Sequence, residues 1–314
     1  MPPELYLGAC QGVARMRKSV LAISCSVAVA LPLAGLLSLG AQSSSNSQTP
    51  GGIRFLHDVV FGKGGNRDLH AEIAMPEKRP ERPMPAVIWI HGGGWANGTY
   101  KLNPASWLAH HGYFTASIEY RLSGEAKWPA QLEDCRTADR WLREHASEYG
   151  INPGAIGVMG ASAGGHLAEC LGTMEQAARN PKRGPSIRVQ AVVSNYGVPD
   201  LAADGPLVNL REQLVGCTLR ENPRAFKDAS PINFVQAGDP PVLLVHGDMD
   251  TTVPIVFAER FEKALKRANV PVEMIRVRNA AHGLNHQDGA PPMEPDPHEI
   301  RRRILEFFDK HLKK

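Results

Sequence analysis

The sequence predicts an α/β domain with a mostly parallel central sheet of about eight strands, helices on both faces and a short insertion after the sixth strand. From residue 55 onward, short apolar runs alternate with segments of helical periodicity, which is typical of strands joined by crossover helices. The run from Pro85 to Ile90 is apolar throughout, as a parallel strand covered on both faces should be. Hydrophobic residues make up 43% of the chain, enough for a full core.

Each element follows from a local pattern. Strands are expected at 55–61, 68–75, 85–90, 113–120, 155–159, 189–194, 242–246 and 272–277, the first two forming an antiparallel hairpin around the Gly-rich turn 62–66. Helices are expected near 103–111, 129–148, 162–174, 254–269 and 298–312, with a shorter one at 206–215 inside the insertion 198–238. The last helix carries an apolar stripe of Ile300, Ile304, Phe308 and Leu312, which makes Arg301–Arg303 its solvent face.

The net charge and the cysteine spacing bear on which partners and metal sites can be expected. The net charge is +3, and the first 41 residues hold three basic residues and one acidic residue, so the remainder carries about +1. A nearly neutral body gives no electrostatic reason to expect nucleic acid as a partner. Outside the first 41 residues, Cys135, Cys170 and Cys217 lack metal-ligand spacing and allow at most one disulfide. We interpret them as small buried hydrophobic residues.

The N-terminus has the pattern of an export signal. Arg15, Arg17 and Lys18 precede an apolar stretch from Ser19 to Gly40, and small residues follow. We therefore expect residues 1–41 to be a signal peptide or N-terminal anchor, with Met1 or Met16 as the start. Residues 42–52 read as a flexible linker, and 53–314 as the catalytic domain. This predicts a secreted or periplasmic protein, without stable membrane association unless the leader stays uncleaved.

The strongest chemical signal is Gly160-Ala161-Ser162-Ala163-Gly164, between a predicted strand and a predicted helix. A nucleophilic serine is exposed on such a sharp strand-to-helix turn, and small neighbours let the backbone pass closely. The helix N-terminus also offers free N–H groups to a developing oxyanion. The pattern alone also occurs by chance, but its position here favours a catalytic Ser162.

A second motif, His91-Gly92-Gly93-Gly94-Trp95, follows the buried strand at 85–90. Three consecutive glycines are entropically costly, and they let backbone N–H groups approach a ligand. Such a loop supplies part of the oxyanion hole in ester hydrolases, although a tight turn is the simpler alternative. His91 itself is interpreted as a structural hydrogen-bonding residue.

A nucleophilic serine needs a base and an orienting acid. Asp248 and Asp250 follow one predicted strand and His282 follows the last, each at a carboxyl end, where open α/β sheets bind ligands. His286 is the weaker candidate base. His166, one helical turn past Ser162, is interpreted as a packing or hydrogen-bonding residue.

These motifs together resemble the esterase/lipase branch of the α/β-hydrolase superfamily that uses an HGGG loop, over roughly residues 55–314. The segments Glu119–Ser123 and Trp128–Asp134 are similar to carbohydrate esterases that act on acetyl or feruloyl esters. The resemblance implies an α/β-hydrolase fold and no metal or cofactor. It also implies site roles: nucleophile Ser162, base His282, acid Asp250, and oxyanion-hole amides of Gly93, Gly94 and Ala163.

The function expected from this resemblance is hydrolysis of short-chain carboxylic esters, on small molecules or polysaccharides. Trp95 and Tyr196 follow strands near the expected pocket and could stack on a sugar or aryl group, or pack in the core. The N-terminal cap helices seen in some relatives are not evident, which implies an open site. An amidase or peptidase, a lipase, and a catalytically inactive binding relative remain as alternatives.

Overall fold

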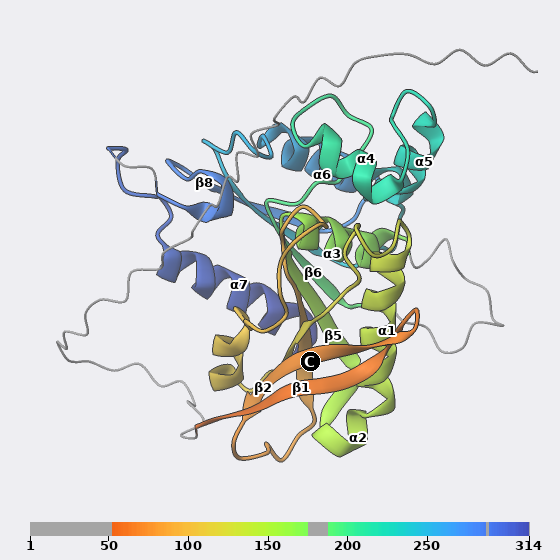
Figure 1. Cartoon of the computed structure of the whole chain (residues 1–314). Helices are drawn as coiled ribbons and strands as arrows, with labels where there is room; N and C mark the ends of the chain where they lie inside the picture. Colours follow the sequence, from red (N-terminus) through yellow and green to blue (C-terminus); the bar gives the residue numbers. More distant parts are fainter. Residues whose placement is uncertain (1–51, 175–187, 287–288, 314) are drawn as a thin grey trace, which may run out of the picture. The chain divides into compact units, whose positions relative to one another are not determined.

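An eight-stranded sheet organises the part of the chain that the computed structural model describes, residues 52–174, 188–286 and 289–313 (Figure 1). The strand order is β1-β2-β4-β3-β5-β6-β7-β8. Strand β2 is antiparallel to both of its neighbours, and all pairings from β4 to β8 are parallel. The predicted fold class is confirmed. The strands are β1 (Ile53–Gly64), β2 (Arg67–Pro76), β3 (Met84–Ile90), β4 (Phe114–Ile118), β5 (Ile151–Ala161), β6 (Ala191–Asn195), β7 (Val242–Gly247) and β8 (Val272–Val277).

By its internal contacts the chain divides into the units Met1–Asn46 and Ser47–Lys314. The predicted leader, 1–41, and the linker up to residue 51 lie outside the described residues. Within the described ranges, no helix combines the length and the apolar character needed to cross a membrane.

The opening hairpin has longer strands than the sequence predicts. Residues 62–64, expected in the turn, continue the ladder, with Gly62 opposite Leu69 and Gly64 opposite Arg67. The turn itself is Gly65-Asn66. A Cβ at Gly62 would lie only 2.4 Å from Cγ2 of Thr137, so glycine there lets the first long helix pack closely against β1.

Helices cover both faces of the sheet. One face packs against α1 (Ala130–Glu144), α3 (Ala163–Thr173) and α6 (Val256–Arg267), and the other against η1 (Ser106–His111) and α7 (Pro297–Leu312). Strand β3 contributes side chains to the hydrophobic cores on both faces of the sheet. Ile88 and Ile90 pack on the face of α1, α3 and α6, and Val87 packs on the face of η1 and α7. This explains why residues 85–90 are apolar at every position.

The helix predictions hold with two changes. The stretch 129–148 is two helices, α1 and α2 (Ala146–Tyr149), since α1 ends at His145, whose Nδ1 lies 2.9 Å from the Trp141 carbonyl. The helix expected near 103–111 is the 3₁₀ helix η1, closed by Gly112 in the left-handed conformation. The predicted stripe of α7 is buried, as are Cys135 and Cys170, whereas Cys217 is partly exposed.

The insertion after β6 contains α4 (Val208–Val215), α5 (Pro223–Asp228) and η3 (Pro231–Phe234). Arg211 of α4 is 2% exposed, and its guanidinium donates to the carbonyls of Leu201, Ala203 and Gly205. Leu210 lies over the glycine loop, because a Cβ at Gly94 would come within 2.6 Å of its Cδ1. The insertion is therefore fixed against that loop.

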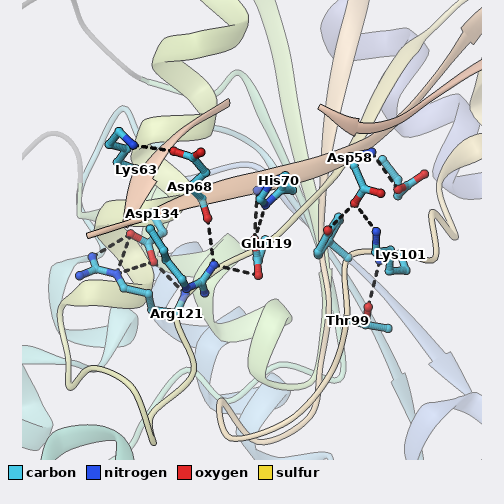
Figure 2. A network of polar contacts seen from close by, with 12 residues as sticks. Asp58, Lys63, Asp68, His70, Thr99, Lys101, Glu119, Arg121 and Asp134 are labelled. Carbon is cyan, nitrogen blue, oxygen red and sulfur yellow. Dashed lines mark hydrogen bonds and ion pairs between the residues drawn. The ribbon is translucent and has the colours of Figure 1, made fainter. Parts of the chain in front are cut away.

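A polar network ties the hairpin to the loops that follow β3 and β4 (Figure 2). Its ion pairs join Asp58 to Lys101 and Arg121 to Asp134, and a side-chain hydrogen bond joins His70 to Glu119. The pair of Asp58 and Lys101 is solvent-exposed and contributes little to stability, and His70 and Glu119 are partly exposed. The exception is Asp134, which is buried and accepts from the guanidinium and the backbone N–H of Arg121, the latter at 2.8 Å. This bond fixes the loop between β4 and α1.

Candidate active site

Ser162 stands on a sharp turn between β5 and α3, in a sparsely populated conformation with φ 55° and ψ −117°. The flanking glycines have a steric cause. A Cβ at Gly160 would lie 2.1 Å from the Gly164 carbonyl oxygen, and a Cβ at Gly164 would lie 2.1 Å from the carbonyl oxygen of Ile90. No side chain fits at either position without opening the turn.

Ser162, His282 and Asp250 form one line of hydrogen bonds. Nδ1 of His282 lies 2.8 Å from Oδ2 of Asp250, and Nε2 lies 3.1 Å from Oγ of Ser162. Because a carboxylate only accepts, Nδ1 carries the hydrogen and Nε2 is left to accept the serine proton. Asp250 follows β7 and His282 follows β8, so neighbouring parallel strands deliver both residues to one edge of the sheet.

Asp250 is 5% exposed and held on both oxygens. Its Oδ1 accepts from the backbone N–H groups of Thr252 at 2.9 Å and Val253 at 2.8 Å, while Oδ2 faces His282 and lies 3.4 Å from Nε2 of His246. Burial alone would raise the pKa of Asp250, but the hydrogen bonds from His246, His282 and Val253 outweigh it and lower that pKa. The carboxylate therefore stays ionised beside His282.

The structure separates the two candidate acids. Asp248 is exposed, and its Oδ1 accepts from the backbone N–H of Asn279 at 2.8 Å. That bond joins the loop after β7 to the loop that leads to His282. His286 is likewise exposed and donates to the carbonyl of Ala290 at 3.0 Å. Neither residue takes part in the line through Ser162.

The loop from His91 to Trp95 lies against the serine. A Cβ at Gly92 would contact Cβ of Ser162 at 3.4 Å. Gly93 and Gly94 have left-handed φ angles of 110° and 60°, and a Cβ at Gly93 would lie 2.2 Å from the Asn97 carbonyl oxygen. Ala163 is the first residue of α3, so its N–H has no partner within the helix. The three predicted donors thus belong to the glycine loop, which lies against Ser162, and to the residue that follows Ser162.

The segment Glu119–Ser123, quoted above for its resemblance, supports this loop. The Tyr120 ring stacks on His91 with centroids 4.2 Å apart, and its hydroxyl donates to the His91 carbonyl at 3.1 Å. The N–H of Ser123 donates to the carbonyl of Trp95 at 2.7 Å. His91 is buried, its Nδ1 lies 2.7 Å from the Gly92 carbonyl, and burial lowers its pKa. These contacts fit the structural role expected for His91.

The two aromatic residues predicted to stack on substrate have different surroundings. Trp95 is 0% exposed, with its ring edge against His166, so the stacking role is wrong for Trp95 and the core alternative holds. Tyr196 is partly exposed and packs edge-on against the His282 ring, with centroids 4.9 Å apart. Burial, together with the Asp250 carboxylate, raises the pKa of Tyr196 to about 12. Tyr196 therefore remains a candidate for contact with substrate.

Sequence reasoning missed the place of His246 in the site. This buried residue is the last but one of β7, donates from Nε2 to the Val253 carbonyl at 2.7 Å and flanks the Asp250 carboxylate. The available signal was its spacing, four residues before Asp250 in the motif His246–Pro254.

Comparison with known proteins places this geometry among esterases. The BD-FAE family model matches residues 71–265, more than half of the chain. Esterase LipC of Mycobacterium tuberculosis is 32% identical over 67% of this chain and 56% of its own length, and Esterase LipQ of the same organism is 33% identical over 73% and 57%. The chain thus spans a little more than half the length of these curated relatives.

Solved structures agree. A truncated carbohydrate esterase from gut microbiota has a TM-score of 0.69 and 26% identity, covering 83% of this chain and 97% of that structure. An acetyl ester-xyloside bifunctional hydrolase from Caldicellulosiruptor lactoaceticus has a TM-score of 0.67 and 27% identity, covering 78% and 89%. With the family match and the geometry of the elbow, these likenesses lead to one conclusion: the chain belongs to the BD-FAE family, within the α/β-hydrolase superfamily.

Proposed function

We propose that this protein is a serine hydrolase of carboxylic esters with short acyl groups. The observation that carries the proposal is the line from Ser162 Oγ through the His282 ring to Asp250, with contacts of 3.1 and 2.8 Å. The experiment that tests it is hydrolysis of p-nitrophenyl acetate by the wild type and by Ser162→Ala, with loss of turnover expected only in the variant.

Each residue of the site has a role in one step of the proposed mechanism. Nε2 of His282 takes the proton of Ser162 as Oγ bonds to the ester carbonyl carbon, and the carbonyl oxygen becomes an oxyanion. The amides of Gly93, Gly94 and Ala163 donate to that oxyanion, each worth about 3 kcal/mol of barrier by the cost of removing one donor. His282 then protonates the departing alcohol, leaving an acyl group on Ser162. Water, activated by His282, releases the acid and restores the serine.

The substrate we propose is an acetyl ester, or a feruloyl ester, borne on a small molecule or a polysaccharide. The support is the likeness to a carbohydrate esterase and to an acetyl ester-xyloside hydrolase. A panel of acetylated and feruloylated xylan fragments beside acyl esters of increasing length tests it. Acid release from the fragments is expected, and a preference for long-chain triglycerides would identify a lipase instead.

An amidase is the alternative that the same residues could serve. Matched esters and anilides with one acyl group separate the two, because both give the same acyl-enzyme and differ only in the group that leaves during acylation. A higher kcat/KM for the anilide would overturn the ester assignment.

We also propose that the protein is exported. The support lies in the sequence: Arg15, Arg17 and Lys18, the apolar stretch from Ser19 to Gly40, and the small residues around Ala41. An exported esterase would meet polysaccharide-borne esters outside the cytoplasm, which is consistent with the proposed substrate.

A further inference from the structure

His166 joins three separate segments of the molecule through one ring. It lies in the first turn of α3, its backbone N–H donates to the Ser162 carbonyl at 3.0 Å, and its side chain is 0% exposed. Nδ1 lies 3.2 Å from Nε1 of Trp95, and Nε2 lies 2.8 Å from the carbonyl of Ala229. The indole N–H can only donate, so Nδ1 accepts, and Nε2 carries the hydrogen that Ala229 receives.

The partner on Nδ1 has an unusual backbone. Trp95 has a φ of 58°, and it follows Gly93 and Gly94 at 110° and 60°, which makes three consecutive left-handed residues. For a bulky aromatic residue this conformation is unfavourable, and it persists only where the surroundings fix it. Trp95 is held by the N–H of Ser123 on its carbonyl and by His166 on its indole. The position of the Trp95 indole therefore helps to set the direction of the backbone N–H groups of Gly93 and Gly94.

The partner on Nε2 belongs to the insertion. Ala229 is the C-terminal cap of α5 and is 0% exposed. The Trp128 ring, from the segment before α1, packs against His166 with centroids 5.5 Å apart. The nucleophile helix, the glycine loop and the insertion thus meet at a single imidazole.

We propose that His166 is a positioning residue for the reaction, which holds the amides of Gly93 and Gly94 against Ser162 by fixing the indole of Trp95. The inference rests on the proposed function. The ring is suited to this task because burial lowers the pKa of His166 to about 4, so it stays neutral near pH 7 and keeps Nδ1 as an acceptor. A residue of this kind affects the transition state, in which the oxyanion exists, more than the bound ester.

The test separates positioning from packing. His166→Phe keeps a planar ring but removes both hydrogen bonds, and Trp95→Phe removes the donor at the other end. Leu171→Ala, a buried residue of the same helix, is the matched control for lost packing. Each variant is assayed for kcat and KM with p-nitrophenyl acetate, for the Ki of a trifluoromethyl ketone whose hemiketal oxygen copies the oxyanion, and for thermal stability.

We expect His166→Phe to lower kcat at least ~10-fold, a fraction of the ~10²–10³ cost of deleting a whole donor, with KM changed less than ~3-fold. The Ki of the trifluoromethyl ketone should rise by the same factor by which kcat falls. Trp95→Phe should give a similar loss, and the double variant little more, because both single variants remove the hydrogen bond between Trp95 Nε1 and His166 Nδ1. His166→Gln, which can accept and donate, should recover part of the rate. Leu171→Ala should lose stability but keep kcat within about twofold.

The inference is overturned if His166→Phe keeps its kcat, or if its loss matches that of Leu171→Ala. Should His166→Phe fail to fold, Trp95→Phe decides by the same criteria. Absence of any Ser162-dependent hydrolysis in the wild type would instead remove the proposed function, and this inference with it.

Discussion

His282 and Asp250 meet through a hydrogen bond of 2.8 Å between Nδ1 and Oδ2, and the other carboxylate oxygen is taken by the backbone amides of Thr252 and Val253. The carboxylate cannot rotate without losing these amides. It therefore fixes the imidazole in the one tautomer and orientation that leave Nε2 open toward Ser162.

Removal of the serine hydroxyl tests the nucleophile. Ser162→Ala should lose labelling by a fluorophosphonate probe and nearly all turnover, because serine triads lose up to ~10⁶-fold in kcat without the nucleophile. Labelling is measured by mass spectrometry of the labelled peptide. Full labelling of the Ala variant at another serine would contradict the assignment.

Asp250→Asn should slow turnover by about 10⁴-fold, since an amide at this position can hold the imidazole in the wrong tautomer. The matched control is Asp248→Asn, which keeps an oxygen for the Asn279 N–H and should cost little activity. Both are compared by kcat at constant pH. A severe effect of Asp248→Asn with a mild effect of Asp250→Asn would exchange their roles.

Glu169 makes stability depend on pH. Its carboxyl is 2% exposed, Oε1 accepts from Ser194 Oγ at 2.7 Å, Oε2 has no hydrogen-bond partner among the described residues, and burial raises its pKa from 4.5 to about 8. The folded state therefore holds a proton that the unfolded state releases above pH 4.5. This contribution to stability is full below pH 4.5, declines as pH rises and levels off above about 8.

Glu169→Gln keeps the acceptor for Ser194 and cannot ionise. We expect its melting temperature to exceed that of the wild type increasingly between pH 6 and about pH 8, with a constant difference above that, as measured by calorimetry. Equal pH profiles for the two proteins would show that Glu169 is not a neutral buried acid.

The side chain of Leu210 should limit acyl length, because it lies over Gly94, one of the proposed oxyanion donors. The wild type is expected to favour acetyl to butyryl esters and to fall beyond about six carbons. Leu210→Ala should raise kcat/KM for hexanoyl relative to acetyl esters by about fourfold per methylene newly buried, from ~0.8 kcal/mol each. Val208→Ala, an exposed position on the same helix, is the control and should leave the ratio unchanged. An unchanged ratio in Leu210→Ala would place the acyl group elsewhere.

The export prediction is checked on the native protein. N-terminal sequencing of the mature form should begin near Ala41–Ser43, after removal of the apolar stretch. A soluble cytosolic fraction that retains Met1 or Met16 would contradict it.

Local sequence was sufficient for much of the site because its parts are short turns at strand ends. The glycines around Ser162 and the spacing of Asp250 and His282 are visible in the chain, and the structure brings these side chains together. The burial of Trp95 could not be predicted from its neighbours in the sequence. It depends on contacts with His166 and Ser123, which lie 71 and 28 residues away. The extra length of β1 was not visible either, because it consists of pairing between residues 62–64 and β2 in a segment that reads as a Gly-rich turn.

At Gly164 the start of α3 presses on the end of β3, with no room for even a methyl group against the Ile90 carbonyl. The spacing between the end of β3 and the start of α3 is therefore set at this point by main-chain contact. Side chains of the insertion, such as Leu210, can then vary without altering that spacing. A scaffold arranged in this way can exchange one ester for another over evolution, or in directed evolution, while its chemistry is inherited intact.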